Sequence, residues 1–393
     1  METAIKGKSP RLLSLDVLRG ATMASMILVN DPGDWSHVYP FLDHSEWNGC
    51  TPTDLVFPFF LFMVGVSIVF AMEKRKEATA DHGKLIWHAF KRMLTLLTIT
   101  YGVHLFFSWA DVYKFNLLTF LSDWRTVLGH MRLPGVLPRI AVVYFISTVI
   151  YLKTTAKTRV WVFAGALIGY WAIMTLIPVP GVGYANLNPA TNLGAWIDVH
   201  VFGTNHLWTD SKVWDPEGIL GTLPAIGTAL FGIRVGTWLK SDKDAATKVT
   251  WMFIYGMLAI LIALFWDLFF PINKKLWTSS FVLYTGGLAT IALASLYWLI
   301  DICGYKKATP FFVAFGMNSI TAYVMADIVP GLMGAIPATY NGQKTNLYGW
   351  LYQTCFVPFF TPINASVMAA IALVLIIWLI MYPLYKKNII IKV

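Results

Sequence analysis

The chain has 393 residues, of which 57% are hydrophobic and only 13% are charged, and its formal net charge is +9. Soluble domains carry about 25% charged residues, so this composition excludes an ordinary soluble enzyme and indicates helices that face lipid or one another. Three cysteines exclude a disulfide framework, and no C-x-x-C or H-E-x-x-H pattern occurs, so we expect no metal site.

The amino-terminal segment is basic at its start and then becomes apolar, as a signal peptide does. Asp16 and Arg19 interrupt the apolar part, and no small-residue cleavage site follows. We therefore predict a retained first helix over residues 12–30. A membrane-spanning helix needs about 20 mostly apolar residues, and nine further candidates lie at 53–72, 85–107, 135–153, 159–177, 218–239, 249–270, 277–300, 309–330 and 363–385.

Four of these candidates begin with a capping residue directly before a proline, the residue favoured at the first helical position. The four pairs are Thr51-Pro52, Asp215-Pro216, Thr309-Pro310 and Thr361-Pro362. Asp54 follows Thr51 by three residues, which is the spacing of a capping box. Glu217 lies where a carboxylate would suit the positive end of a helix. Both acids are therefore expected to be mainly structural.

The positions of lysine and arginine predict the orientation of the chain. With the amino terminus in the cytosol, twenty of the 30 basic residues fall on the cytosolic side, seven on the other side and three within spans. The positive-inside rule then places both termini in the cytosol. This also explains the net charge without a nucleic-acid partner. We predict an all-α integral membrane protein of about ten transmembrane helices, forming a single domain over residues 1–393.

The connections on the predicted outer side differ from the short, basic cytosolic ones. They are long and rich in Trp, Tyr and Pro, and they cover residues 31–52, 108–134, 178–217 and 331–362. Long ordered loops in a compact protein are usually functional, so the outer face is expected to be the working face. Cys50 and Cys355 both fall in these loops, and the sequence leaves open whether they form a bridge.

Charged residues inside membrane spans are costly, and they are functional hypotheses by default. Asp16 and Arg19 lie on one helix face, either as an internal ion pair or as part of an anion site. Arg139 is expected to face a polar cavity. Arg234 can snorkel to the cytosolic surface or join the anion site. Asn318 can bond between helices or line a pocket.

His44 begins the stretch HSEWN in the outer loop after the first span, which Asn30 closes. Imidazole accepts a proton near neutral pH, and the amides of Asn30 and Asn48 can donate hydrogen bonds to an oxyanion. Trp47 offers an apolar face for a sugar ring, and Glu46 lies beside it. These residue types suit transfer of an acyl group to a sugar amine or hydroxyl.

Seven stretches, in order along the chain, resemble the heparan-alpha-glucosaminide N-acetyltransferase family: RLLSLDVLRG (11–20), VN (29–30), HSEWNGCTPTDLVFPFFLFMVG (44–65), RLPGVLPRIAVVYF (132–145), DPEGILGT (215–222), PINKKLWTSS (271–280) and TPFFVAFGMNSI (309–320). The resemblance implies a multispan enzyme that moves acetyl from cytosolic acetyl-CoA to a glucosamine amine across the membrane. It implies a homodimer, with His44 as the catalytic residue and Asn30 in the active site.

The family stretch RLLSLD begins at residue 11, without the long extension of the animal lysosomal enzymes. This predicts a bacterial member in the inner membrane with its active loop on the periplasmic face. The phosphates of acetyl-CoA are then expected at the basic inner end, where the candidate cofactor residues are Arg11, Asp16, Arg19, Arg234 and Asn318. The candidate acceptor residues are Glu46, Trp47, Asn48 and Arg139.

The resemblance leaves the acceptor open. It also leaves open whether the acceptor attacks in a ternary complex or an acetylated His44 forms first. Two other functions remain in play, namely an O-acetyltransferase of envelope glycans and a secondary transporter of sugars or muropeptides. The transporter is disfavoured because paired repeats and paired broken helices are not evident in the sequence.

Overall fold

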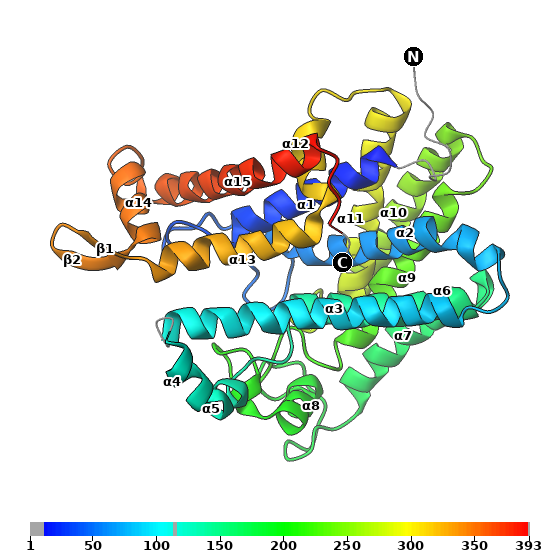
Figure 1. Cartoon of the computed structure of the whole chain (residues 1–393). Helices are drawn as coiled ribbons and strands as arrows, with labels where there is room; N and C mark the ends of the chain where they lie inside the picture. The colour runs from blue at the N-terminus through cyan, green and yellow to red at the C-terminus, as the bar shows by residue number, and fades with distance from the viewer. Residues whose placement is uncertain (1–11, 113–115, 392–393) are drawn as a thin grey trace.

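The computed structural model describes residues 12–112 and 116–391 (Figure 1). Its long helices are α1 (Leu13–Asn30), α2 (Val56–Glu77), α3 (Gly83–Phe107), α6 (Val136–Lys153), α7 (Ala156–Leu176), α9 (Thr222–Leu239), α10 (Ala245–Asp267), α11 (Ser279–Leu296), α13 (Ser319–Ala335) and α15 (Pro362–Lys386). A 3₁₀ turn, η1 (Pro52–Leu55), leads directly into α2. The nearly all-α fold class predicted from the sequence is confirmed.

Seven of the described helices are long and apolar enough to cross a membrane. The span predicted at 309–330 is broken, because α12 (Thr309–Met317) and α13 meet at 86° on either side of Asn318. Helices α1 and α9 lie where spans were predicted but are not among the seven. Most of their residues are buried against protein, 11 of 18 in α1 and 12 of 18 in α9. These two helices therefore need not be as apolar as a lipid-facing helix. The count of ten spans and the cytosolic termini stay predictions.

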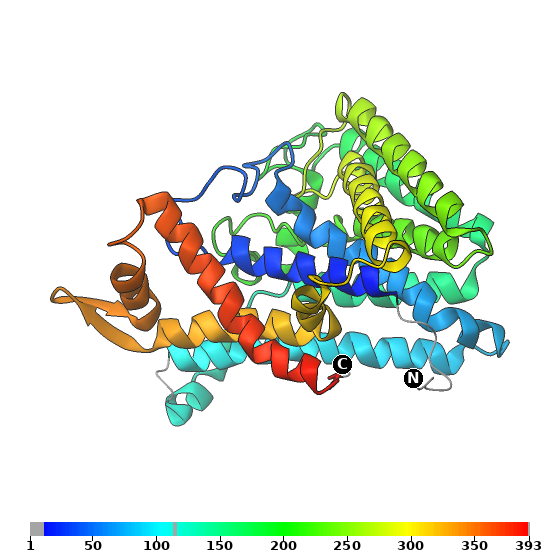
Figure 2. The same ribbon diagram turned by 90° about the horizontal axis from the view of Figure 1, so that it is seen from above.

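The long segments predicted on the outer side form small ordered elements. They hold α4 (Leu117–Ser122), α5 (Trp124–Gly129), α8 (Leu193–Phe202), α14 (Leu347–Cys355) and the antiparallel pair of β1 (Pro337–Tyr340) with β2 (Gln343–Asn346). The hairpin and α14 project from the body at the end that also carries α4 and α5 (Figures 1 and 2). Cys50 and Cys355 are both free thiols, so the bridge between these two segments is not formed.

Helices α2 and α9 pack with their backbones in contact. A Cβ atom at Gly65 of α2 would lie 1.9 Å from the carbonyl oxygen of Ala229, and one at Gly232 of α9 would lie 2.0 Å from that of Phe62. Small residues allow such close approach between membrane helices, where dispersion contacts drive association. The contact fixes α2, whose amino-terminal end carries η1.

Two of the predicted helix starts are confirmed as stated. Thr51 caps η1 through a reciprocal capping box with Asp54, and Thr361 precedes α15 with Pro362 at its first position. Thr309 was expected to be the capping residue before α12, but it is the first residue of the helix itself. The capping rule therefore finds a helix start to within one residue where the following segment is continuously apolar.

Gly65→Ala is expected to lower the thermal unfolding temperature of the detergent-solubilised protein, because the added methyl group overlaps the Ala229 carbonyl. Overpacking of this kind costs about 1–3 kcal/mol. The matched control is Gly102→Ala in α3, where nothing lies within 4 Å of the new Cβ. Equal unfolding temperatures for the two variants would contradict the close α2–α9 contact.

Candidate active site

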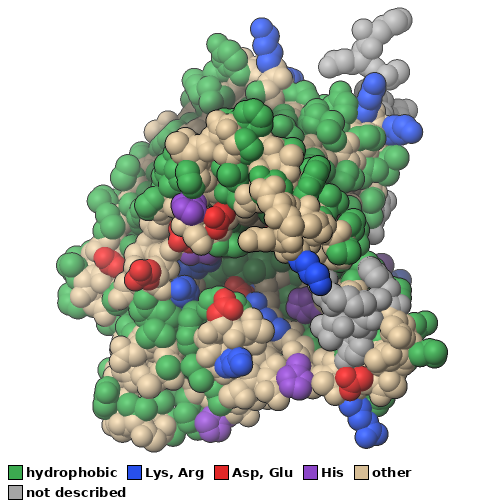
Figure 3. All heavy atoms as spheres, turned by 90° about the vertical axis from the view of Figure 1, so that its left-hand side faces the viewer, with side chains coloured by type: hydrophobic (Ala, Val, Ile, Leu, Met, Phe, Trp, Pro, Cys, Tyr) green, Lys and Arg blue, Asp and Glu red, His purple; other side chains and the backbone are tan. Residues whose placement is uncertain are grey.

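A cavity of about 1440 Å³ runs along α2 and is also walled by α1, α3, α6 and α13. It touches α2 from Val56 to Arg75, a separation of about 28 Å at 1.5 Å per helical residue. This is close to the roughly 30 Å thickness of a bilayer core. Figure 3 shows the molecule hollowed on one face, with acidic, basic and histidine side chains gathered around the hollow.

The two ends of the cavity differ in chemistry. One end is lined by Asn30, His44, Asp54, Arg132, Glu217 and Lys274. The middle is apolar, with residues such as Met23, Met63 and Val64. The other end is basic, with Arg19, Arg75, Lys84, His88, Lys91 and Arg92. Below, these two ends are called the His44 end and the basic end.

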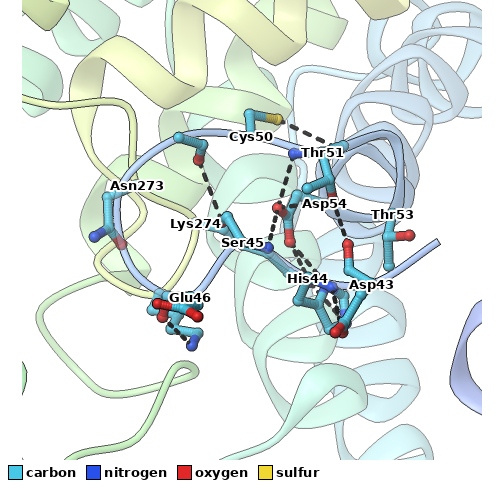
Figure 4. A network of polar contacts seen from close by, with 12 residues as sticks. Asp43, His44, Ser45, Glu46, Cys50, Thr51, Thr53, Asp54, Asn273 and Lys274 are labelled. Carbon is cyan, nitrogen blue, oxygen red and sulfur yellow. Dashed lines mark hydrogen bonds and ion pairs between the residues drawn. The ribbon is translucent and has the colours of Figure 1, made fainter. Parts of the chain in front are cut away.

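His44 forms a close pair with Asp54 (Figure 4). Its Nδ1 atom lies 2.7 Å from Oδ1 of Asp54, and that carboxylate is only 1% exposed. An ionised carboxylate can only accept hydrogen bonds, so the network assigns the imidazole proton to Nδ1. The Nε2 atom is then left with a lone pair that can accept a proton.

The second oxygen of Asp54 orders the loop that carries His44. Oδ2 accepts hydrogen bonds from the backbone N–H of Ser45 at 3.1 Å and from that of Thr51 at 3.0 Å. The predicted cap is therefore present. The interpretation of Asp54 as only a cap is incomplete, because the same side chain also contacts His44, ten residues earlier.

Lys274 lies against this pair from a distant part of the chain. Its Nζ atom is 3.0 Å from Nδ1 and 3.5 Å from Nε2 of His44, and 3.4 Å from Oδ1 of Asp54. Because Nδ1 donates to Asp54, the attractive partner of the ammonium group is the carboxylate. Burial lowers the pKa of Lys274, and the charge of Asp54 acts against that shift.

The turn that presents Lys274 is fastened to the His44 loop. The Gly49 N–H donates to the Ile272 carbonyl at 2.7 Å, and the Asn273 side chain donates to Oδ1 of Asn48 at 3.1 Å. Trp277, in the same turn, has a positive φ of 56°, which is unusual for a bulky residue. Its fully buried ring holds that conformation, so the turn is rigidly defined.

None of the four predicted acceptor residues lines the large cavity, whereas Asn30, predicted to act in catalysis, lines it together with His44. Asn48 instead accepts a hydrogen bond from Asn273, and Glu46 is exposed. The Trp47 indole donates to the Leu187 carbonyl at 3.0 Å and meets the Trp214 ring edge-on. Trp47 and Asn48 therefore fasten the loop to neighbouring segments.

Arg139, predicted to face a polar cavity that binds the acceptor, does not line the large cavity. It lines a second cavity of about 20 Å³ with Asp198 and Asp215. Its Nη2 atom donates to the Gly218 carbonyl at 2.8 Å, and its guanidinium group lies 5.3 Å from the centre of the Trp277 ring. Burial raises the pKa of Asp198 to about 7. This cavity is too small for a sugar.

Of the predicted cofactor residues, Arg19 and Asn318 line the large cavity. Arg19 makes the internal ion pair with Asp16 at 3.0 Å and donates to Ser67 at 2.8 Å, so it ties α1 to α2. Asp16 is buried in that pair. Arg234 is exposed and lies away from the cavity. Arg11 lies outside the described residues.

Asn318 also holds the carboxy-terminal segment. Its amide donates to the Ile389 carbonyl and accepts from the Ile391 N–H, each at 2.8 Å. Both groups of the side chain are therefore used at the break between α12 and α13, beside the cavity wall. This contact between residues some 70 positions apart has no signal in the local sequence.

The predicted helix start at Asp215-Pro216 is wrong, because α9 begins only at Thr222. Arg132 makes a two-pronged contact with Asp215, at 2.7 and 2.9 Å, and also binds Glu217 at 2.6 Å. These charge-assisted contacts outweigh a first-turn position for the two acids. Glu217 thereby becomes part of the cavity wall near His44.

Sequence reasoning missed Lys274 and, apart from Arg19, the lysines and arginines of the basic end. Lys274 lies in PINKKLWTSS, a stretch singled out only for its resemblance to the family. The basic residues of α2 and α3 were assigned to a cytosolic connection, and only the packing of α3 against α6 and α13 turns them into a cavity wall.

The fold and the site together define a helical membrane protein with a histidine–carboxylate pair inside a cavity of bilayer length. No family model matches the chain. Heparan-alpha-glucosaminide N-acetyltransferase from Homo sapiens is 30% identical over 372 residues, which cover 81% of this chain and 53% of the human protein. The protein of the same name from Mus musculus is 29% identical over 377 residues, covering 82% and 54%.

The chain belongs to the heparan-alpha-glucosaminide N-acetyltransferase family, which confirms the resemblance seen in the sequence. It spans about half the length of these curated relatives. The family supports an acyltransferase.

Asp54→Asn is expected to lower turnover in an acyl-transfer assay by about 10²–10⁴-fold, because an amide can donate to Nδ1 and favour the wrong imidazole tautomer. The sequence alone predicted little effect, since it indicated only the cap. Asp34→Asn is the matched control, because Asp34 pairs with His37 at 2.8 Å outside the cavity. If the Asp54→Asn variant had turnover close to that of Asp34→Asn, the role of Asp54 would be purely structural.

Proposed function

We propose that this protein transfers acetyl from acetyl-CoA to the amine of a glucosamine or related amino sugar, with the two substrates entering from opposite sides of the membrane. The observation that carries the proposal is the cavity that joins the basic end to His44 over about 28 Å. A donor lying along this cavity can keep its phosphates on one side and present its thioester on the other.

The basic end suits the phosphates of the donor. Arginine and lysine are the side chains that bind phosphate best, and five of them line this part of the cavity besides His88. The excess of basic residues on the predicted cytosolic side supports placing this end in the cytosol. The apolar middle suits the less polar arm that carries the thioester.

The His44 end suits the chemistry of acyl transfer. Nε2 of His44 takes a proton from the acceptor amine as its nitrogen attacks the thioester carbon. A C–N bond forms, the C–S bond breaks, and the CoA thiolate leaves with the electron pair and takes up a proton. Asn30, on the same cavity wall, is proposed to donate a hydrogen bond to the oxyanion.

The finer features of the proposal rest on the resemblance and on charge. A homodimer, a bacterial inner membrane and a periplasmic His44 end follow from these alone. An O-acetyltransferase would use the same pair with a hydroxyl acceptor, so paired assays with a glucosamine and with a hydroxyl-only glycan separate the two. A transporter is disfavoured because α12–α13 is the single broken span among the described helices.

His44→Ala is expected to abolish acetyl transfer while acetyl-CoA still binds and the protein still inserts in the membrane. A positioned general base contributes about 10²–10⁴-fold, and a covalent nucleophile contributes more. The assay follows CoA release and acetylated glucosamine with purified protein. His37→Ala, in the same loop but outside the cavity, is expected to keep turnover. Wild-type turnover in His44→Ala would overturn the proposed site.

Arg92→Ala is expected to raise the KM for acetyl-CoA more than the KM for the acceptor, because Arg92 lines the basic end. Loss of a charged hydrogen bond is worth about 1.5–3 kcal/mol, which corresponds to a rise of roughly tenfold or more. Arg234→Ala is the matched control, since Arg234 is exposed and away from the cavity. A larger effect at Arg234 would place the phosphates elsewhere.

A further inference from the structure

We infer that Lys274 is a positioning residue for the His44–Asp54 pair, whose fixed positive charge opposes protonation of Nε2 and keeps His44 available as a base near neutral pH. The inference rests on the proposed function and goes beyond it. Lys274 has no role in the chemistry predicted from the sequence. The inference follows from three polar groups that come from two distant parts of the chain.

Two opposite charges act on the imidazole of His44. The Asp54 carboxylate, 2.7 Å from Nδ1, attracts positive charge on the ring and fixes the tautomer that leaves Nε2 free. The Lys274 ammonium group, at 3.0 and 3.5 Å from the two ring nitrogens, repels a second positive charge. The two side chains therefore act in opposite directions on a proton added at Nε2.

The turn that carries the Lys274 ammonium group is held in place by several contacts. The turn is bonded to the His44 loop at Gly49 and Asn48 and is held by the buried Trp277. The Lys274 side chain is itself only 16% exposed. A flexible surface lysine would spread its charge over many conformations and be screened by water. This one stays within hydrogen-bonding distance of the imidazole.

The other charged groups around His44 do not replace Lys274. Asp43 accepts from the backbone N–H of His44, and the ammonium of Lys275 donates to the Glu46 carbonyl. The Cys50 thiol is neutral, because burial raises its pKa to about 12. Glu217 is compensated by Arg132. The other titratable side chains beside the pair or on the same cavity wall are therefore Asp43, Cys50, Arg132, Glu217 and Lys275, while Glu46 is exposed.

Lys274→Met tests the inference through the pH profile of kcat/KM, which reports groups of the free enzyme. Without the ammonium group, Asp54 favours the imidazolium, so the acidic limb of the profile is expected to move to higher pH by about one unit or more. Activity lost at neutral pH should return in part at alkaline pH. Lys274→Arg keeps the charge and should keep the limb in place. Lys275→Met, the neighbouring lysine, should move it less.

A second measurement does not depend on acetyl transfer. Diethylpyrocarbonate modifies the neutral imidazole, and mass spectrometry of the peptide that contains His44 gives its rate of modification at each pH. In Lys274→Met this rate should rise only at higher pH than in the wild type. His37 in the same samples serves as an internal reference, because its partner is Asp34 and no lysine contact is present among its described bonds.

The outcomes separate this inference from the proposed function. An equal loss of activity at every pH, with an unchanged modification profile, would show that Lys274 only supports the turn and would overturn the inference. Wild-type turnover in His44→Ala would overturn the proposed function instead. The modification profile would then still decide whether Lys274 controls the protonation of His44.

Discussion

The site depends on one buried carboxylate, whose charge must be paired and whose oxygens must accept hydrogen bonds. Asp54 is almost inaccessible to solvent, and a charge removed from water is tolerated only when it is paired and hydrogen-bonded. Its two oxygens contact the imidazole of His44, two backbone N–H groups of the loop that leads into α2, and the ammonium group of Lys274. The same bonds that stabilise this charge therefore bring together groups from residues 44–54 and 271–278.

The helices around this site differ in whether they face lipid or other helices. Helix α10 presents many exposed apolar side chains, as a lipid-facing helix does. Helices α1 and α9 lie largely buried and carry polar groups such as Asp16 and Thr228. The broken span at Asn318 borders the cavity and is bonded by the carboxy-terminal segment. Irregular backbone at this depth is tolerated because protein, rather than lipid, satisfies its polar groups.

The shape and lining of the cavity fit the function proposed above. On that proposal, a donor with a charged end and a reactive end would lie along about 28 Å of α2, and only the acetyl group would change sides. The basic end would hold the phosphates and the His44 end would hold the thioester, so neither substrate would have to cross the membrane.

The sequence by itself determined the helices and the family, and it singled out His44 as the candidate catalytic residue. Apolar runs and capping residues are local signals, and a helix satisfies its own backbone, so ten predicted segments coincide with helices even where α12–α13 is bent. Only the tertiary structure decided which polar residues meet. Asp54 carried the signal of a cap, Glu217 was assigned to a helix start, and Lys274 carried no signal. Their contacts with His44, Arg132 and the cavity depend on packing between segments up to 230 residues apart. The spacing of residues along one helix or loop cannot encode such distances, because they are set by how several helices pack together.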